Sequence, residues 1–214
     1  MEGPEAARPA AEKKSIHATE RDTEENLRKR EIFVEAIRHT APEDLIYLDE
    51  SGVSTQMTRL YARAPRGVRV HAGVPGGHWK MLTVVGAMDH NGMLATMTVE
   101  AATDREVFLA YLDHVLCPKL RAGHVVVMDN LSTHKVQGVR ERIEACGASL
   151  LYLPPYSPDL NPIEKAWFKL KQALRAIAAR TADQLHNAIA KLLPTITTKD
   201  ARAWFRLRFS RLHL

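Results

Sequence analysis

The chain has 214 residues, 45% of them hydrophobic, with a formal net charge of +5 and a pI of about 9.3. This composition supports a packed core and excludes global disorder, and the mild basic excess fits a polyanionic partner without identifying one. Two cysteines make no disulfide framework, and no apolar run reaches the roughly 18 residues that cross a bilayer. We therefore expect a cytoplasmic protein with no membrane partner.

The first 42 residues are expected to form a tail and a linker helix. Residues 1–18 are rich in Ala, Pro, Glu and Lys, which predicts a disordered tail. Residues 19–39 carry apolar side chains at helical spacing, and the run 41–44 (APED) ends that helix.

Residues 43–196 are predicted to form one α/β domain, followed by a basic helix over 197–214. The first part of the α/β domain should be an antiparallel meander, because Asn91-Gly92 is a strong hairpin signal between two apolar runs. The strands expected there are 45–50, 79–89 and 92–100, with a weaker one at 69–74. Strands are then expected at 124–129 and 149–154, and helices at 104–120, 136–147, 161–179 and 181–196. Three antiparallel strands followed by alternating strands and helices predict a mixed sheet.

Two of these strands end in an acid, Asp49 after LIYL and Asp129 after VVVM. If the strands are neighbours, the two carboxylates lie side by side and repel each other unless a cation neutralises them. Mg²⁺ prefers such oxygen ligands. The alternative is that each Asp only starts a turn, and the residues alone leave both interpretations open.

Glu164 has two possible roles. Asn161 suits an N-cap, Pro162 the first helical position and Glu164 the N3 position of a capping box. The helix after it presents an apolar stripe that should dock on the sheet, which would let Glu164 face the strand ends. The stripe consists of Ile163, Trp167, Leu170, Leu174 and Ile177. All three tryptophans of the chain, Trp79, Trp167 and Trp204, are expected in the core or at interfaces.

Three segments resemble the DDE catalytic domain of bacterial insertion-sequence transposases of the mariner superfamily. They are LDESG (48–52), MDNLSTHK (128–135) and LPPYSPDLNPIEKAWFKLK (153–171), and 58–67 and 77–80 are also similar to the family. Thirty-four residues separate Asp129 from Glu164, which is the family spacing. The resemblance covers about residues 43–195. It implies a ribonuclease H-like fold in which Asp49, Asp129 and Glu164 are catalytic and hold two Mg²⁺ or Mn²⁺ ions.

The resemblance also implies a reaction and its supporting residues. The family cleaves phosphodiester bonds at transposon ends and transfers the 3′-OH into target DNA, typically at TA. Asn130 and His134 match its DNxxxH motif and would position ligands or substrate, unless they are only a turn cap and a surface histidine. Contacts to DNA phosphates are expected from several basic residues, of which those on the helix after Glu164 could equally form a solvated face. These are Arg59, Arg63, Arg66, Lys80, Lys135, Lys165 and Lys169.

The chain departs from the family before its first catalytic strand. Relatives carry a helix-turn-helix region there, whereas about 40 residues precede the first catalytic strand of this chain. The expected partners are double-stranded DNA, a second copy in an active homodimer, and a separate helix-turn-helix chain, in a nucleoid-associated setting. The alternative is a truncated, non-catalytic remnant that binds DNA or dimerises. A ribonuclease H or a Holliday-junction nuclease of the same fold is disfavoured by the PPYSPDLNPIE run.

Overall fold

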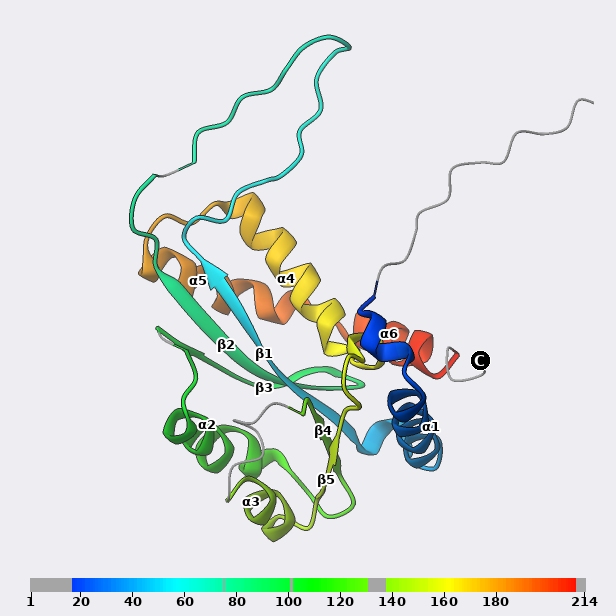
Figure 1. Ribbon diagram of the computed structural model, residues 1–214. Coiled ribbons are helices and arrows are strands. Elements are labelled where there is room, and N and C mark those ends of the chain that lie inside the picture. Colours follow the sequence, from blue (N-terminus) through cyan, green and yellow to red (C-terminus); the bar gives the residue numbers. More distant parts are fainter. Residues whose placement is uncertain (1–16, 75, 101, 131–137, 211–214) are drawn as a thin grey trace, which may run out of the picture.

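The computed structural model describes residues 17–74, 76–100, 102–130 and 138–210, the last four by their backbone alone. Its centre is one five-stranded sheet with the strand order β3-β2-β1-β4-β5 (Figure 1). The strands are β1 (Leu45–Ser54), β2 (Met81–Asp89), β3 (Gly92–Val99), β4 (Val125–Met128) and β5 (Ser149–Tyr152). β1, β2 and β3 pair antiparallel, while β1, β4 and β5 pair parallel. The predicted mixed sheet is therefore confirmed.

Helices cover both faces of this sheet. One face of the sheet carries α2, which a π turn (Leu112–Leu116) continues, and α3 (Figure 1). The other face carries α4 and α5, and α1 and α6 pack on the same core at the end of the sheet. The helices are α1 (Glu24–Arg38), α2 (Arg105–Tyr111), α3 (Val139–Ala145), α4 (Ile163–Ile177), α5 (Ala182–Leu192) and α6 (Thr198–Ser210). In the part of the chain that the structure describes, no helix has the length and hydropathy to span a membrane.

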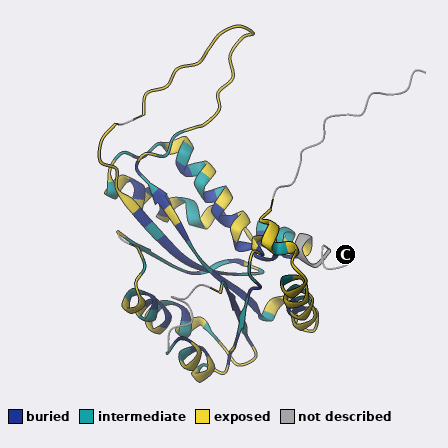
Figure 2. Ribbon diagram, in the orientation of Figure 1, coloured by how far each residue is buried: buried dark blue, intermediate teal, exposed yellow. Residues whose placement is uncertain are grey.

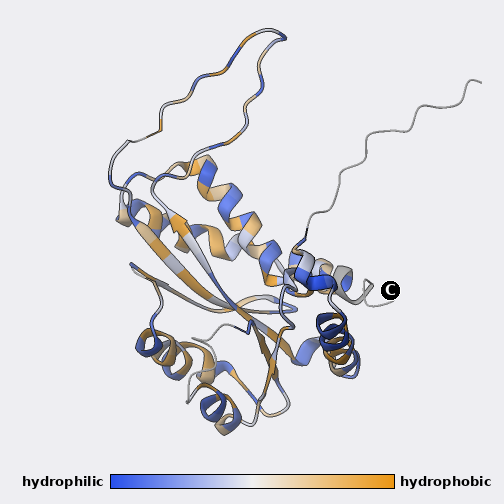
Figure 3. Cartoon of the chain, in the orientation of Figure 1, coloured by the Kyte–Doolittle hydropathy of each residue, from blue (hydrophilic) through white to orange (hydrophobic). Residues whose placement is uncertain are grey.

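Alternation along β1 divides the core into two layers. Leu45 and Tyr47 face α4, whereas Ile46 and Leu48 face α2 and α3, and all four are buried. Burial on both faces explains why the first four residues of this strand form an unbroken apolar run. The strands at the centre of the sheet are largely buried (Figure 2), and hydrophobic residues alternate with polar ones on the helices that cover them (Figure 3). α6 belongs to the same packing, because Phe205 is 2% exposed and meets the Tyr47 ring edge-on at 5.4 Å.

Two local predictions are confirmed and one is wrong. Gly92, at a φ of 136°, starts β3 after the predicted turn, and the Thr181 side chain caps α5 by accepting from the backbone N–H of Gln184. The weak strand at 69–74 does not form. Residues 69–74 are exposed and lie in the long loop between β1 and β2, which projects away from the sheet and its strand edges (Figures 1 and 2).

Candidate active site

The first two acids lie on neighbouring parallel strands. Leu48 pairs with Met128, so Asp49 and Asp129 follow the last paired position. Both continue the face of Tyr47 and Val127, which is the α4 side of the sheet. β4 ends here, but β1 runs on to Ser54 because it still pairs with β2. The expectation that β1 ends at its acid is wrong, while the two aspartates do lie at one place in the sheet.

Glu164 lies in the first turn of α4 and is exposed. The predicted capping box is wrong, because α4 begins with Pro162 as its cap and has no side-chain cap bond. The Asn161 amide, which was expected to cap, instead donates from Nδ2 to Asp49 Oδ2 over 3.1 Å. The apolar stripe of α4 ends earlier than predicted, since Ile177 is 51% exposed. It also includes Ala166, which is buried and was not predicted to belong to it.

Among the residues that the structure describes, three donors surround the Asp49 carboxylate. Oδ1 accepts the Glu50 backbone N–H at 2.8 Å, and Oδ2 accepts Asn161 Nδ2 and, at 3.2 Å, Trp167 Nε1. Trp167 was expected in the core, and it is 2% exposed, but its hydrogen bond to Asp49 was missed. One signal could have found it: Trp167 follows Glu164 by three residues, which places both side chains on one helix face.

The charges of the other two acids act on Asp49. The pKa of Asp49 is raised from 3.8 to about 7, first by burial, then by the negative charge of Glu164 and, more weakly, of Asp129. The hydrogen bonds from the Glu50 backbone and from Trp167 act in the opposite direction. Like charges held this near each other are the situation that a divalent cation relieves. The sheet and α4 thus gather three carboxylates that interact electrostatically.

The chemistry of this donor set fits a hard cation such as Mg²⁺ or Mn²⁺, which takes carboxylate and amide oxygens. A second observation agrees, because Asn161 Oδ1 is buried and lacks a hydrogen-bond partner among the described residues. As the described side chains stand, no three His, Cys, Asp or Glu groups converge on a single metal position. Joint binding of one ion would therefore require movement of a side chain, and exposed Glu164 is the one with room to move.

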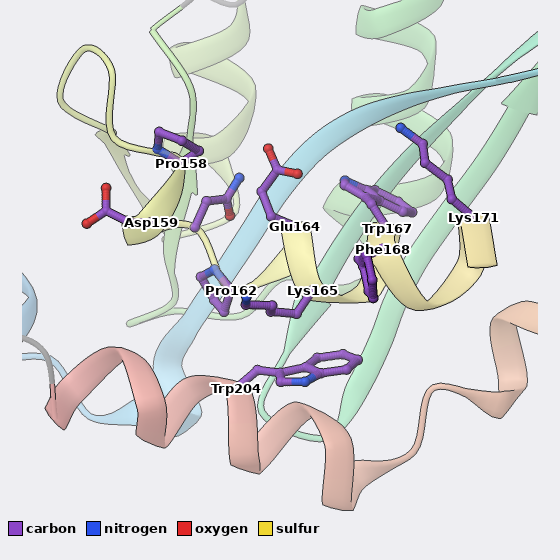
Figure 4. A pocket seen from close by; sticks show the side chains of 10 residues that line it. Pro158, Asp159, Pro162, Glu164, Lys165, Trp167, Phe168, Lys171 and Trp204 are labelled. Atoms are coloured by element: carbon purple, nitrogen blue, oxygen red, sulfur yellow. The ribbon is translucent and has the colours of Figure 1, made fainter. Parts of the chain in front are cut away.

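A cavity of about 480 Å³ lies between the start of α4 and α6 (Figure 4). Glu164 and Asn161 line it, whereas Asp49 and Asp129 do not. In Figure 4, Phe168 points from α4 toward Trp204 on α6. Lys165 and Lys171 are also among its lining residues. The cavity thus places basic and aromatic side chains beside the third acid.

The predicted DNA contacts have different surroundings. Four lie exposed on the loop between β1 and β2, namely Arg59, Arg63, Arg66 and Lys80. Lys165 is exposed on α4, but Lys169 is held by Asp200 at 2.6 Å and by the Thr195 carbonyl at 2.8 Å. This bond between α4 and the start of α6 was not predicted.

The predicted DNxxxH residues lie only partly in the described chain. Asn130 is exposed just after β4. His134 and Lys135 fall outside the described residues. The roles of these three side chains therefore stay predictions.

The chain matches a known protein family. The family described as DDE superfamily endonuclease matches residues 44–186, which is more than half of the chain and falls inside the predicted domain 43–196. Among individual proteins, the Tc1 transposase of Caenorhabditis elegans is 41% identical over 70 residues, 31% of this chain and 26% of the relative. The Tcb1 transposase of Caenorhabditis briggsae is 30% identical over 105 residues, 47% of this chain and 38% of the relative. The chain thus spans well under half the length of these relatives.

Solved structures share the fold. A Mos1 transposase paired-end complex with the left transposon end aligns with a TM-score of 0.77 at 15% identity, over 95% of this chain and 65% of that chain. The catalytic domain of the Mos1 mariner transposase aligns with a TM-score of 0.67 at 14% identity, over 89% and 91%. The predicted ribonuclease H-like fold is confirmed by this likeness.

Proposed function

The chain belongs to the DDE superfamily endonuclease family, and from this premise we propose that it is the catalytic part of a transposase. It would cleave phosphodiester bonds at transposon ends and join the freed 3′-OH to target DNA. The observation that carries the proposal is the gathering of Asp49 and Asp129, on neighbouring parallel strands, within electrostatic reach of Glu164.

We propose Asp49, Asp129 and Glu164 as ligands of two Mg²⁺ or Mn²⁺ ions. Solved Mos1 paired-end complexes are described with Mg and with Mn, which supports a divalent metal here. When bound, two such ions would stabilise the charge on the attacking and leaving oxygens of an in-line displacement at phosphorus. The repulsion that raises the pKa of Asp49 is the property of this site that such ions would relieve.

The protein's own groups would orient the reaction. Asp49 is held on both oxygens by neighbouring donors, so its carboxylate has a fixed direction. In the first step water forms a bond to phosphorus, the bond to the 3′ oxygen breaks, and a 3′-OH and a 5′-phosphate result. In the second step that 3′-OH attacks a target phosphodiester, so one P–O bond forms and one breaks without an added energy source.

Double-stranded DNA is the proposed substrate. Arg59, Arg63, Arg66 and Lys80 would contact phosphates from the exposed loop, and Lys165 would do so beside Glu164. We propose His134, Lys135 and Asn130 as supporting residues on the strength of the motif alone. The ion pair with Asp200 makes Lys169 the weakest of the proposed DNA contacts.

The active assembly would be a homodimer on two transposon ends, as the paired-end description of Mos1 suggests for that protein. Recognition of the end sequence would come from a helix-turn-helix segment or chain. The proposed bacterial insertion-sequence origin rests on the sequence motifs, whereas the matched relatives come from Caenorhabditis. The proposed cytoplasmic, nucleoid-associated location rests on the cysteine content, the lack of a long apolar run and the proposed DNA substrate.

The test is nicking of supercoiled plasmid DNA in Mn²⁺ by the wild type, Asp129→Ala and a control, Asp183→Ala, at an exposed acid of α5. We expect metal-dependent nicking by the wild type and the control only, with salt-sensitive DNA binding kept by all three. Equal nicking by Asp129→Ala would refute the assignment. A wild type that binds DNA but never nicks above Asp129→Ala would instead favour a non-catalytic remnant.

A further inference from the structure

We propose that Asn161 and Trp167 are positioning residues that fix the Asp49 carboxylate for a divalent cation, and that Asn161 Oδ1 accepts a hydrogen bond from a water molecule of that cation. The inference rests on the proposed function, in which Asp49 is a metal ligand. Neither residue was predicted to touch an acid, and each is buried, with exposures of 6% and 2%.

The hydrogen bonds of Asp49 determine which of its oxygens faces a ligand. An ionised carboxylate offers about four lone-pair sites. Asn161 Nδ2 and Trp167 Nε1 occupy those of Oδ2, and the Glu50 backbone N–H occupies one on Oδ1. The remaining site is therefore on Oδ1. We infer that Oδ1 is the oxygen that ligates the cation while Oδ2 serves as the anchor.

The orientation of the Asn161 amide follows from the same contact. Its Nδ2 must face the Asp49 carboxylate, since the flipped amide would set two acceptors against each other. Oδ1 is thereby turned away, and it is buried without a partner among the described residues. A buried acceptor without a donor is costly. Asn161 bonds to Asp49 and also lines the cavity wall that carries Glu164, so a water on a cation held between these two acids can supply the missing donor.

Gly86 sets the height of the Trp167 indole above the sheet. It is the β2 residue directly paired with Asp49. A Cβ built at Gly86 would lie 2.5 Å from one ring carbon of Trp167 and 3.2 Å from a second. Only glycine lets the ring rest on the strand, and the ring in this place brings Nε1 to Asp49. The glycine, the indole and the acid therefore act as one unit.

Metal affinity gives a readout beyond activity. Binding of Mn²⁺ is measured by the loss of the paramagnetic resonance signal of the free ion, for the wild type, Trp167→Phe, Asn161→Ala and Asp49→Asn. Loss of a hydrogen bond to a metal ligand typically weakens affinity 10- to 100-fold. We expect about a tenfold rise in the Mn²⁺ dissociation constant for Trp167→Phe and Asn161→Ala.

In the plasmid assay, kcat of these two variants should fall while their KM for DNA stays unchanged. The control Tyr111→Phe removes a buried hydrogen bond on the α2 side of the sheet and should change neither quantity.

A second pair of variants tests the role of Gly86. Gly86→Ala should displace the indole and weaken Mn²⁺ binding. In the double variant Gly86→Ala/Trp167→Phe, the shorter ring lacks the clashing ring atoms, and the Met93 methyl, 2.9 Å from the same Cβ, is the end of a flexible side chain. The melting temperature should therefore recover in part relative to Gly86→Ala. Its Mn²⁺ affinity should equal that of Trp167→Phe alone. A double variant weaker in Mn²⁺ binding than Trp167→Phe would show that Gly86 does not act through the indole.

The outcomes separate this inference from the proposed function. If Trp167→Phe and Asn161→Ala bind Mn²⁺ like the wild type while Asp49→Asn does not, the positioning role is wrong and the metal site stands. If Asp49→Asn binds Mn²⁺ and nicks DNA like the wild type, the proposed function itself fails.

Discussion

Replacing Glu164 with Gln should stabilise the metal-free protein above pH 7 while it abolishes metal-dependent cleavage. Asp49 has a pKa of about 7 because it is buried and because the charges of Glu164 and Asp129 oppose its ionisation. Gln keeps the size of the side chain and removes the charge of Glu164, which raises the pKa of Asp49 more than the charge of Asp129 does. The variant thus separates repulsion in the metal-free site from ligation in the metal-bound one.

The sign of the pH effect follows from proton binding. Between pH 4 and pH 7 the folded protein keeps a proton on Asp49 that the unfolded chain has lost, so the free energy of unfolding falls as pH rises. The free energy of unfolding stops falling above the pKa that Asp49 has in the folded protein. The rise from 3.8 to about 7 corresponds to at most about 4 kcal/mol. Glu164 is the second cause after burial, so its replacement should restore about 1 kcal/mol.

Urea unfolding in EDTA at pH 5 and pH 8 measures this difference. Asp200 and Asp159 have lowered pKa values, so the stability that they add is lost only below about pH 4 and does not affect the comparison. The wild type should lose more stability between pH 5 and pH 8 than Glu164→Gln. Mg²⁺ at 100 times its dissociation constant should add about 2.7 kcal/mol to the wild type at pH 8, and less to the variant. Identical pH profiles of the two proteins would refute the reasoning.

Three further outcomes are expected. The triple variant Arg59→Ala/Arg63→Ala/Arg66→Ala should weaken binding to all DNA sequences alike and reduce the slope of log K against log salt by about 3, as measured by fluorescence anisotropy at several salt concentrations. Thr181→Ala should cost about 1 kcal/mol in urea unfolding, because the α5 cap bond is lost, whereas Thr181→Asn should not. Gly92→Ala should cost about 1–3 kcal/mol in the same assay, because a φ of 136° is strained for alanine and its Cβ would lie 3.2 Å from a backbone oxygen.

The sheet could be predicted because its signals are local. The apolar runs before Asp49 and Asp129 reflect strands covered on both faces, and Asn91-Gly92 fixes the β2–β3 turn. These features do not depend on distant residues. The gathering of the acids could be predicted only in part, since strand order had to be assumed from a resemblance. The structure supplies that order by pairing Leu48 with Met128.

Contacts between residues far apart in the sequence determine the surroundings of three side chains that local patterns predicted wrongly or incompletely. Asn161 has the sequence of an N-cap, but the Asp49 carboxylate, 112 residues away in the chain, takes its amide. Lys169 has the sequence of a solvated face, but Asp200 pairs with it. Trp167 has the sequence pattern of an ordinary core residue. Its role beside Asp49 depends on Gly86, which pairs with Asp49 and has no side chain where the indole packs. Each error follows from a partner that no sequence window contains.

The stretch 69–74 shows the opposite case, in which a local pattern had no partner. Val70 and Val74 are 49% and 44% exposed, because the loop that carries them projects away from the sheet and its strand edges (Figure 1). β propensity alone does not form a strand without a neighbour to complete its hydrogen bonds.

The most direct test of the metal site is a crystal structure with Mn²⁺, recorded at the manganese absorption edge. The anomalous signal should lie between Oδ1 of Asp49 and the carboxyl groups of Asp129 and Glu164, with Glu164 turned toward the aspartates. An anomalous peak elsewhere on the surface, or none at a Mn²⁺ concentration that supports nicking, would contradict the account.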